Sequence, residues 1–381
     1  MLPQLLTELV QRPSVNPMGR TDLDPSILNE SRVTAFLEGE LRKLGCEFRR
    51  QQVAEGRDNI IATYTPPHPA PFSVLFEAHQ DTVPVDGMIV EPFGAKVEGG
   101  KLYGRGSCDV KAGVAVMLTA FARLVKEKPA GSAQVTVAFT VDEEHGGSGI
   151  QSLMQSGLRA DYAIVAEPTL LNIVHAHKGV ARWAIETTGR ACHSSRPDQG
   201  VNAVYRMARL LTAIEEYAQQ LQKLPPDPLL GPRTISVGRV LGGVSPNTVP
   251  DFCRADVDRR LIPGETYDTA TADLDAFLRA RPDVDFPFTL ARGSAGCLPL
   301  GPDLSVELVK RFGATIDSVV GKHTVHPVPF GTDAATVAAV GVPVVVFGPG
   351  DIAQAHTKDE WIDLAQLEPA AEILFRFACG K

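Results

Sequence analysis

The sequence predicts an α/β fold into which a smaller α+β domain is inserted. Up to residue 176, short and nearly continuous apolar runs alternate with amphipathic helical patterns, which is typical of a mostly parallel central sheet flanked by helices. This pattern is replaced by another between residues 177 and 291 and then returns. With 381 residues, the chain also exceeds the size at which single cores usually stop growing. We therefore predict one domain from residues 1–176 and 292–381, and an inserted domain over residues 177–291.

Hydrophobic periodicity predicts the elements of the larger domain. Apolar residues recur at helical spacing before Pro13 and over residues 33–44, where Gly45 can end the helix. A longer helical pattern includes residues 114–125, with Asp109 at its expected start. Further helices are predicted over residues 150–154, 304–312 and 364–377. The apolar runs that we predict to be strands are NIIATY, SVLFEA, VTVAFTV, YAIVA and VPVVVF.

The inserted domain has the pattern of half-buried strands. Apolar and polar residues alternate in VARWAIETTG, and TISVGRVLGG and FCRADVDRRL are predicted to be further strands. Helical patterns over residues 201–218 and 274–278 complete a small α+β unit. We predict hinges at its two ends, over residues 177–179 and 293–296.

The composition excludes several classes of partner. The formal net charge of -8 offers no basic face for a phosphate backbone, so we expect no nucleic acid to bind. No apolar run approaches the roughly 20 residues of a membrane span, and the N-terminal segment lacks the basic region of a signal peptide. The six cysteines are scattered singly, unlike a disulfide framework. We expect a cytoplasmic protein with no membrane partner.

Histidines and carboxylates follow several of the predicted strands. His79 and Glu167 come where SVLFEA and YAIVA end, and Glu143 and Glu144 follow VTVAFTV. Because ligands gather beyond the carboxyl ends of strands in open α/β sheets, we expect these side chains to lie together. At a helix start, the carboxylate of Asp109 would be held by backbone amides and could bridge two cations. With a second histidine near the C-terminus, this is the ligand chemistry of a hydrolytic zinc site with room for two ions.

Each residue also has an ordinary structural interpretation. His79 alone could be a surface residue, Glu143 and Glu144 a solvated turn, Asp109 a helix cap and Glu167 a capping carboxylate. The segments GRGSCDVKAG and DEEHGGSG place small residues around the acids, as a crowded metal site requires. Because adjacent acids at a strand end are chemically alike, spacing alone does not distinguish Glu143 from Glu144.

The chain contains a series of short motifs, which are, in order, HQDTVP, GRGSCDVK, DEEHGGSG, AEPT, HSSRPDQGVNA, NTVP, DRRLIPG, FGTDA and AHTKDE. In this order they resemble the motifs of the dizinc deacylase and exopeptidase family. Members of that family include acetylornithine deacetylase, succinyl-diaminopimelate desuccinylase, aminoacylase and glutamate carboxypeptidase. The resemblance covers nearly the whole chain and implies a zinc-peptidase-like catalytic domain with an inserted ferredoxin-like lid and dimerisation domain.

The resemblance also implies roles for the residues of the metal site. Glu143 would be the general base, which takes a proton from an activated water and passes it to the leaving amine. The carboxylate of Asp81 would accept the free imidazole N–H of His79. The peptide bond between Asp109 and Val110 would be cis. The implied ligands are Asp109 for both zinc ions, His79 and Glu167 for one ion, and Glu144 and His356 for the other.

Further residues would act on the substrate. The resemblance implies that His193 polarises the scissile carbonyl, often in the neighbouring subunit, and that Asn247 and Arg260 hold a substrate carboxylate. Gly331 and Thr332 would line the pocket. From the residues alone, His193 could equally be a loop histidine, Asn247 a turn residue and Arg260 an exposed strand residue.

The function that we predict is hydrolysis of the amide bond of an N-acyl amino acid. The cofactors would be two divalent metal ions per subunit, zinc or alternatively cobalt, and the protein would form a homodimer through the lid domain. A carboxypeptidase or dipeptidase would use the same catalytic residues and remains the alternative. A metal-binding protein without catalysis is disfavoured because Glu143 and the ligand set are intact.

Overall fold

The computed structural model describes residues 2–293 and 296–381 and divides into two compact units. The main segment of the second unit begins at Ala176, one residue before the predicted start of the insertion. It ends at Gly301, ten residues beyond the predicted end at residue 291. The predicted hinge over 293–296 includes residues 294 and 295, which lie outside the described residues. Unit 1 comprises Met1–His175, Pro302–His326 and Thr332–Lys381, and unit 2 comprises Ala176–Gly301 and Pro327–Gly331.

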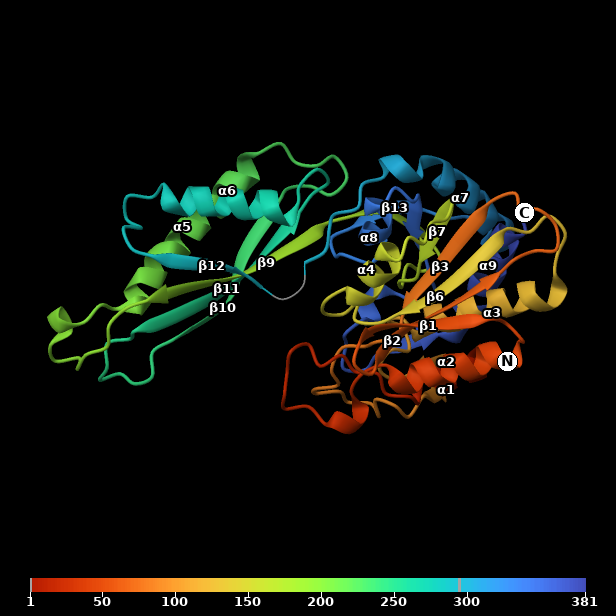
Figure 1. The fold of residues 1–381 in the computed structure, drawn as a ribbon, viewed down its shortest axis with the longest axis horizontal. Coiled ribbons are helices and arrows are strands. Elements are labelled where there is room, and N and C mark those ends of the chain that lie inside the picture. The colour runs from red at the N-terminus through yellow and green to blue at the C-terminus, as the bar shows by residue number, and fades with distance from the viewer. Residues whose placement is uncertain (1, 294–295) are drawn as a thin grey trace. The chain divides into compact units, whose positions relative to one another are not determined.

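An eight-stranded sheet is the centre of unit 1 (Figure 1). Its order is β1-β2-β6-β3-β7-β14-β8-β13, with parallel pairing from β6 through β3 and β7 to β14. The α/β class is therefore confirmed, but the sheet is mixed rather than mostly parallel, because β1–β2, β2–β6 and β14–β8 pair antiparallel. The strands are β1 Phe48–Ala54, β2 Arg57–Tyr64, β3 Ser73–His79, β6 Gln134–Thr140, β7 Tyr162–Val165, β8 Ile173–His177, β13 Val325–Val328 and β14 Val344–Val346.

Helices cover both faces of this sheet. Alternate residues of β3, Val74 and Phe76 among them, join one core with helices α1, α2, α3, α7 and α9. Helices α4 and α8 pack against each other and against β6, β7 and β14, outside that core. The helices are α1 Leu2–Val10, α2 Ser31–Lys43, α3 Lys111–Glu127, α4 Ser148–Gln155, α7 Val306–Val320, α8 Ala334–Ala339 and α9 Leu367–Ala378.

A small three-stranded sheet, ordered β15-β5-β4, also belongs to unit 1. It pairs a segment near the C-terminus with the segment that leads to Asp109, through Trp361↔Tyr103 and its neighbours. Sequence analysis did not predict it, because its strands are only three residues long. Its strands are β4 Lys96–Glu98, β5 Lys101–Tyr103 and β15 Trp361–Asp363, and the short 3-10 helices of unit 1 are Pro25–Ile27, Asp303–Ser305, Ile352–Gln354 and Leu364–Gln366.

Unit 2 contains a four-stranded antiparallel sheet, ordered β10-β11-β9-β12, with two helices. The element order is β-α-β-β-α-β, which with this strand order is the predicted ferredoxin-like topology. Buried side chains of α5, α6 and the sheet form a core of their own. The elements are β9 Gly179–Thr188, α5 Ala203–Lys223, β10 Thr234–Gly242, β11 Phe252–Leu261, α6 Tyr267–Arg279 and β12 Phe288–Arg292, with a 3-10 helix at Pro197–Gln199.

The structure differs from the sequence prediction at the junction of the two units. The predicted hinge over residues 177–179 is almost entirely strand, because β8 ends at His177 and β9 begins at Gly179. A Cβ atom at Gly179 would lie 2.6 Å from the backbone nitrogen of Pro299, so the close approach of two chain segments requires glycine there.

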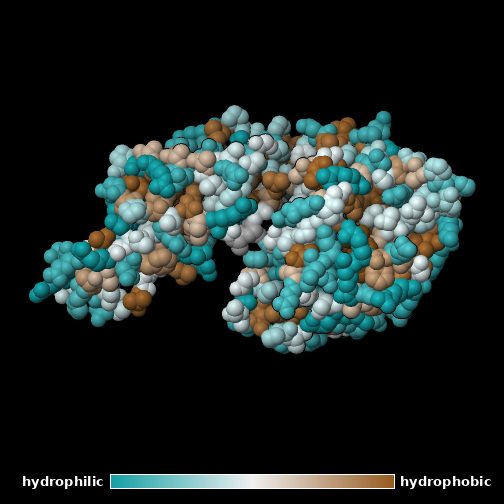
Figure 2. All heavy atoms as spheres, viewed as in Figure 1, coloured by the Kyte–Doolittle hydropathy of each residue, from teal (hydrophilic) through white to brown (hydrophobic). Residues whose placement is uncertain are grey.

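The surface is largely polar. On the face seen in Figure 2, hydrophilic residues predominate and apolar residues occur in separate small groups. Within residues 2–293 and 296–381, no helix has the length and apolar character needed to cross a membrane.

Candidate metal centre

Three adjacent parallel strands deliver the predicted residues to one edge of the sheet. His79 is the last residue of β3, Glu143 and Glu144 lie in the turn after β6, and Glu167 follows β7 by two residues. Because β6, β3 and β7 are neighbours and parallel, their carboxyl ends meet at the same edge. The expectation that these residues lie close together therefore follows from the observed strand order.

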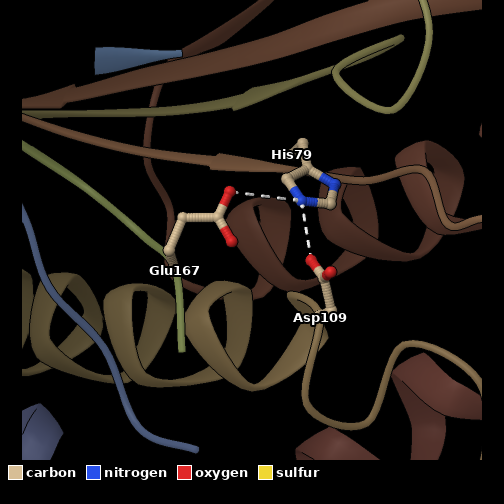
Figure 3. Close-up of side chains that lie close together, drawn as sticks. All are labelled: His79, Asp109 and Glu167. Atoms are coloured by element: carbon tan, nitrogen blue, oxygen red, sulfur yellow. Dashed lines mark hydrogen bonds and ion pairs between the residues drawn. The ribbon is translucent and has the colours of Figure 1, made fainter. Parts of the chain in front are cut away.

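His79, Asp109 and Glu167 form one buried cluster (Figure 3). The Nε2 atom of His79 lies 3.2 Å from Oδ1 of Asp109 and 4.0 Å from Oε1 of Glu167. The other imidazole nitrogen, Nδ1, donates to the backbone carbonyl of Asp81 at 3.0 Å. Because a carbonyl can only accept, Nδ1 carries a proton, and Nε2 is the ring nitrogen that faces the two carboxylates.

A second cluster contains Asp109, Glu144 and His356. The Nε2 atom of His356 lies 3.1 Å from Oε2 of Glu144 and 3.3 Å from Oδ2 of Asp109. His356 has a left-handed backbone conformation, with φ of 60°. The two oxygens of Asp109 thus face different histidines, and Asp109 is the residue that the two clusters share.

The observed position of Asp109 corrects one prediction. Helix α3 begins only at Lys111, and its cap residue Val110 makes no side-chain cap. The Asp109 carboxylate therefore does not bind the amides of a helix start but contacts the two imidazoles. The predicted cis peptide bond between Asp109 and Val110 is present.

The electrostatics of both clusters are dominated by buried negative charge. Burial raises the pKa of Glu167 well above its ordinary value, and the charge of Asp109 adds to this shift. Hydrogen bonds to Asp109 and Glu144 raise the pKa of His356 to about 10. Burial also raises the pKa of Asp109, but hydrogen bonds from His356 and His79 outweigh it and hold that pKa below its ordinary value. The negative charge that raises the pKa of His356 would also attract a divalent cation.

The donor set fits two divalent cations. Each cluster offers imidazole nitrogen and carboxylate oxygen, the ligands that zinc takes in hydrolytic sites, and its candidate ligand atoms lie within 4.8 Å of one another. The Oε1 atom of Glu144 is buried and makes no hydrogen bond within the described residues. A buried carboxylate oxygen left unbonded is costly, and a cation would satisfy it.

The turn that carries Glu143 and Glu144 is anchored by Asp81. The Oδ1 atom of Asp81 accepts the backbone N–H of Glu143 at 3.1 Å, and Oδ2 accepts that of Glu144 at 3.2 Å. Asn16 donates from Nδ2 to Asp81 at 2.8 Å and to Asp142, at the start of the turn, at 2.9 Å. The backbone of the turn is therefore fixed independently of its two glutamate side chains.

The structure gives Asp81 a different contact with His79 from the predicted one. Its carboxylate Oδ1 lies 3.6 Å from Nδ1 of His79, which exceeds hydrogen-bonding distance. The backbone carbonyl of Asp81 accepts that N–H instead, so the residue orients the imidazole through its main chain and the turn through its side chain.

Glu143 lies outside both ligand clusters of the described residues. Burial raises the pKa of its carboxyl well above the ordinary value, and the charges of Asp333 and Glu144 add to this shift. Asp333 is itself buried, and its Oδ2 has no hydrogen-bond partner within residues 2–293 and 296–381. Thr332 precedes it and accepts the N–H of Ala334 through its hydroxyl.

Unit 2 holds the other residues predicted to contact substrate, at two separate places. The loop of His193 pairs with that of Asn247 through a bridge between His193 and Thr248, and both predicted residues are exposed. Arg260 lies near the other end of β11, where it binds Asp258 at 2.9 Å. Asn247 and Arg260 of one chain therefore lie apart, and their binding of a substrate carboxylate stays a prediction.

Gly331 is placed in unit 2 and is tightly packed there. A Cβ atom at this position would lie 2.0 Å from the Sγ atom of Cys297, which leaves no room for a larger residue.

The residues that sequence analysis missed are Asn16 and Glu360. Asn16 lies far from every motif, whereas Glu360 ends the segment AHTKDE and carried no signal except that position.

Comparisons with known proteins agree with this geometry. Residues 75–379 match the model of peptidase family M20/M25/M40. Acetylornithine deacetylase of Myxococcus xanthus is 30% identical to this chain, over 97% of this chain and 95% of its own length. A protein of Aspergillus clavatus named "Probable carboxypeptidase" is 29% identical over 90% of this chain and 82% of its own length.

The fold is also similar to solved structures. An M20 family metallo-carboxypeptidase from Sulfolobus solfataricus superposes with a TM-score of 0.81 and 20% sequence identity. The alignment covers 99% of this chain and 98% of that one. At this identity the likeness concerns the fold, which includes both units.

Proposed function

Because the chain belongs to peptidase family M20/M25/M40, we propose that it is a metal-dependent hydrolase that cleaves the amide bond of an N-acyl amino acid. The observation that carries the proposal is the pair of ligand clusters that share Asp109. The names of its relatives support the substrate class, since acetylornithine deacetylase acts on such an amide.

The proposed centre holds two zinc ions, or two cobalt ions. His79 and Glu167 would hold one ion, Glu144 and His356 the other, and Asp109 would bind both through its two oxygens. When bound, the ions supply Lewis acidity and lower the pKa of a water molecule.

Glu143 is the general base of the proposed reaction. Its carboxylate is outside the ligand clusters, and its raised pKa suits a group that accepts a proton from water and then donates it to the leaving amine. The carboxylate of Asp81 accepts hydrogen bonds from the backbone N–H groups of Glu143 and Glu144, which fixes the turn that carries both side chains and positions base and ligand together.

The substrate site, in this proposal, combines residues of two chains. From Phe252 to Arg260, β11 rises eight residues, or about 26 Å at the usual rise of a strand. The segments that pair His193 with Thr248 leave the sheet of unit 2 at the Phe252 end of β11. A small N-acyl amino acid cannot span that distance, which supports Arg260 serving its own chain's site while His193 and Asn247 serve that of a second copy.

Unit 2 offers a surface for such a second copy. Strand β10 is at the edge of its sheet, so one row of its backbone groups is open to pairing with another strand. Val240 and Leu241 on this strand are about half exposed, at 45% and 51%. A groove of about 470 Å³ runs between β10 and α5, lined by Leu211, Ile214, Ala218 and Val237 among others. We therefore propose a homodimer through unit 2.

Subunit mixing tests the shared site. Glu143→Ala and His193→Ala chains would each be inactive alone, but co-expressed mixed dimers would contain one site with an intact Glu143 and an intact His193. Recovery of activity in isolated mixed dimers supports the shared site. Inactive mixed dimers, or an active protein that remains monomeric, would exclude it.

A substrate panel tests the proposed reaction. Purified protein with added zinc or cobalt should hydrolyse N-acetyl or N-succinyl amino acids faster than dipeptides, with the ratio of kcat/KM values as the measure. Glu143→Ala protein is the control for contaminating hydrolases. The second candidate is a carboxypeptidase or dipeptidase, which the relative named "Probable carboxypeptidase" favours. Faster cleavage of dipeptides would decide for that candidate.

The proposed location is the cytoplasm. The thiols of Cys46, Cys108, Cys192, Cys253 and Cys379 are in no disulfide bond. Scattered thiols of this kind persist in a reducing compartment. Fractionation of cells with an antibody against the protein would test the location.

A further inference from the structure

Glu360 binds the backbone of the loop that carries Asp109. It is fully buried, with 0% of its surface exposed, and lies four residues after His356. Its Oε1 atom accepts the backbone N–H groups of Cys108 at 2.9 Å and Asp109 at 3.0 Å. Its Oε2 atom accepts the backbone N–H of Gly106 at 3.0 Å and the guanidinium of Arg105 at 2.8 Å. Four donors from one loop therefore converge on one carboxylate.

The main chain reinforces this contact. The backbone carbonyl of Glu360 accepts the N–H of Gly104 at 3.0 Å, and β15, which follows Glu360 directly, pairs with β5 just before the loop. The segment of His356 and the loop of Asp109 are thus joined at Glu360 and along the strand that follows it. These two segments are some 250 positions apart in the chain, as the separation of 251 between Asp109 and Glu360 indicates.

Only a carboxylate satisfies all four donors. A glutamine has the same shape, but one of its two terminal atoms is an NH2 group, which would face N–H donors instead of accepting from them. An aspartate is one methylene shorter and could not reach the loop from the same backbone position. Because the donors are buried, those that lose their acceptor would keep an uncompensated desolvation cost.

We propose that Glu360 is a positioning residue that fixes the Asp109 loop, so that Oδ1 of Asp109 stays directed to His79 and Oδ2 to His356. The inference rests on the proposed dinuclear centre. Glu360 touches neither cluster with its own side chain but holds the backbone N–H of the shared ligand. If the loop shifts, both cation sites lose the same ligand geometry.

Cobalt binding to the whole protein tests the proposal without any substrate. Metal-free protein would be titrated with Co²⁺, and its visible absorption spectrum would give both the dissociation constants and the coordination geometry. Glu360→Gln should bind both ions about 10 to 100 times more weakly, as is typical when the hydrogen-bond partner of a ligand is changed, and its spectrum should shift. At saturating cobalt, kcat should remain lowered while KM stays near its original value.

Asp359→Asn is the matched control. It makes the same change of charge one residue away, on an exposed side chain, and should leave cobalt affinity and spectrum unchanged. A folded Glu360→Gln protein with the affinity and spectrum of the original protein would overturn the proposal. If the original protein binds no cobalt, the proposed metal centre is wrong and the positioning role of Glu360 is wrong with it. If the original protein binds cobalt and Glu360→Gln binds it equally well, only the positioning role of Glu360 is wrong.

A second variant covers the case in which Glu360→Gln does not fold. Arg105→Lys keeps the positive charge but changes the donor to Oε2 of Glu360, while the N–H groups of Cys108 and Asp109 still reach Oε1. It should fold and show a loss of cobalt affinity smaller than tenfold but outside the error of the titration. An unchanged dissociation constant in this variant would overturn the proposal.

Discussion

A glutamate-to-glutamine substitution should lower metal binding at Glu144 but not at Glu143, and it should lower turnover at both positions. Glutamine removes the charge and keeps the size of the side chain. Glu144 places Oε2 at 3.1 Å from His356 within a ligand cluster. The hydrogen bond that Glu143 makes within the described residues comes from its backbone N–H, which the substitution leaves in place. We therefore expect Glu143→Gln to retain both metal ions and Glu144→Gln to lose the ion shared with His356.

The expected loss of turnover in Glu143→Gln follows from its role as base. General acid–base groups contribute about 10² to 10⁴-fold, or roughly 2.7 to 5.4 kcal/mol of barrier at about 1.36 kcal/mol per tenfold. The metal-free protein should become no less stable. Burial and the charges of Asp333 and Glu144 raise the pKa of Glu143, so its ionised form is unfavourable in the folded protein, and an uncharged amide relieves that repulsion.

Three measurements on each variant check this reasoning. Elemental analysis gives the metal content, steady-state kinetics give kcat and KM, and thermal unfolding of the metal-free protein gives Tm. The unmodified protein and His145→Gln, which changes the neighbouring residue, provide the reference. Full activity in Glu143→Gln would remove it as the base. Loss of metal from Glu143→Gln, with retention in Glu144→Gln, would exchange the two roles.

Three other predictions concern pH, packing and metal removal. Burial lowers the pKa of His177 from 6.5 to about 4, so stability that is present above pH 6.5 is lost as pH falls toward 4. His177→Gln should reduce this acid loss by up to about 3 kcal/mol in urea unfolding, and equal pH profiles would contradict the assignment. Phe312 is fully buried with its ring 4.9 Å from that of Phe347 and 5.1 Å from that of Phe377, so Phe312→Ala should cost about 3 to 5 kcal/mol of unfolding free energy, and a cost under 1 kcal/mol would argue against this packing. A chelator should abolish hydrolysis and added zinc or cobalt should restore it; activity that persists in metal-free protein would refute metal dependence.

Apolar patterning predicted the central strands well because those strands are buried on both faces. Strands β2, β3, β6 and β7 coincide with NIIATY, SVLFEA, VTVAFTV and YAIVA to within a few residues. Strand β1 was missed, since FRRQQVA is mostly polar and each of its side chains is exposed or half-buried at the sheet edge. The polar sequence gives no signal, and the pairing with β2 that makes it a strand is a tertiary contact.

The site shows the same limit. Strand ends located His79, Glu143, Glu144 and Glu167, but spacing alone did not separate Glu144 from Glu143. The family resemblance assigned them different roles, and in the folded chain it is Glu144 that lies 3.1 Å from His356. Main-chain contacts were also out of reach, because a sequence names side chains and not backbone groups. For this reason the carbonyl of Asp81 and the amides held by Glu360 could not be anticipated.

The two ends of unit 2 lie side by side, which bears on how the interrupted unit 1 can assemble. His177 and Leu300 exchange two backbone hydrogen bonds, both of 3.0 Å, and Val180 pairs with Cys297 in the same way. An unstructured insert of this length would destabilise unit 1 by about 4 kcal/mol at 25 °C, which is the entropic cost of closing the loop. Once residues 176–301, the main segment of unit 2, have folded, the ends of that segment already meet, and the chain behaves as though unit 1 were joined by a short turn. Folding of the insert first would therefore speed the docking of the C-terminal segment, which brings both the central strand β14 and His356.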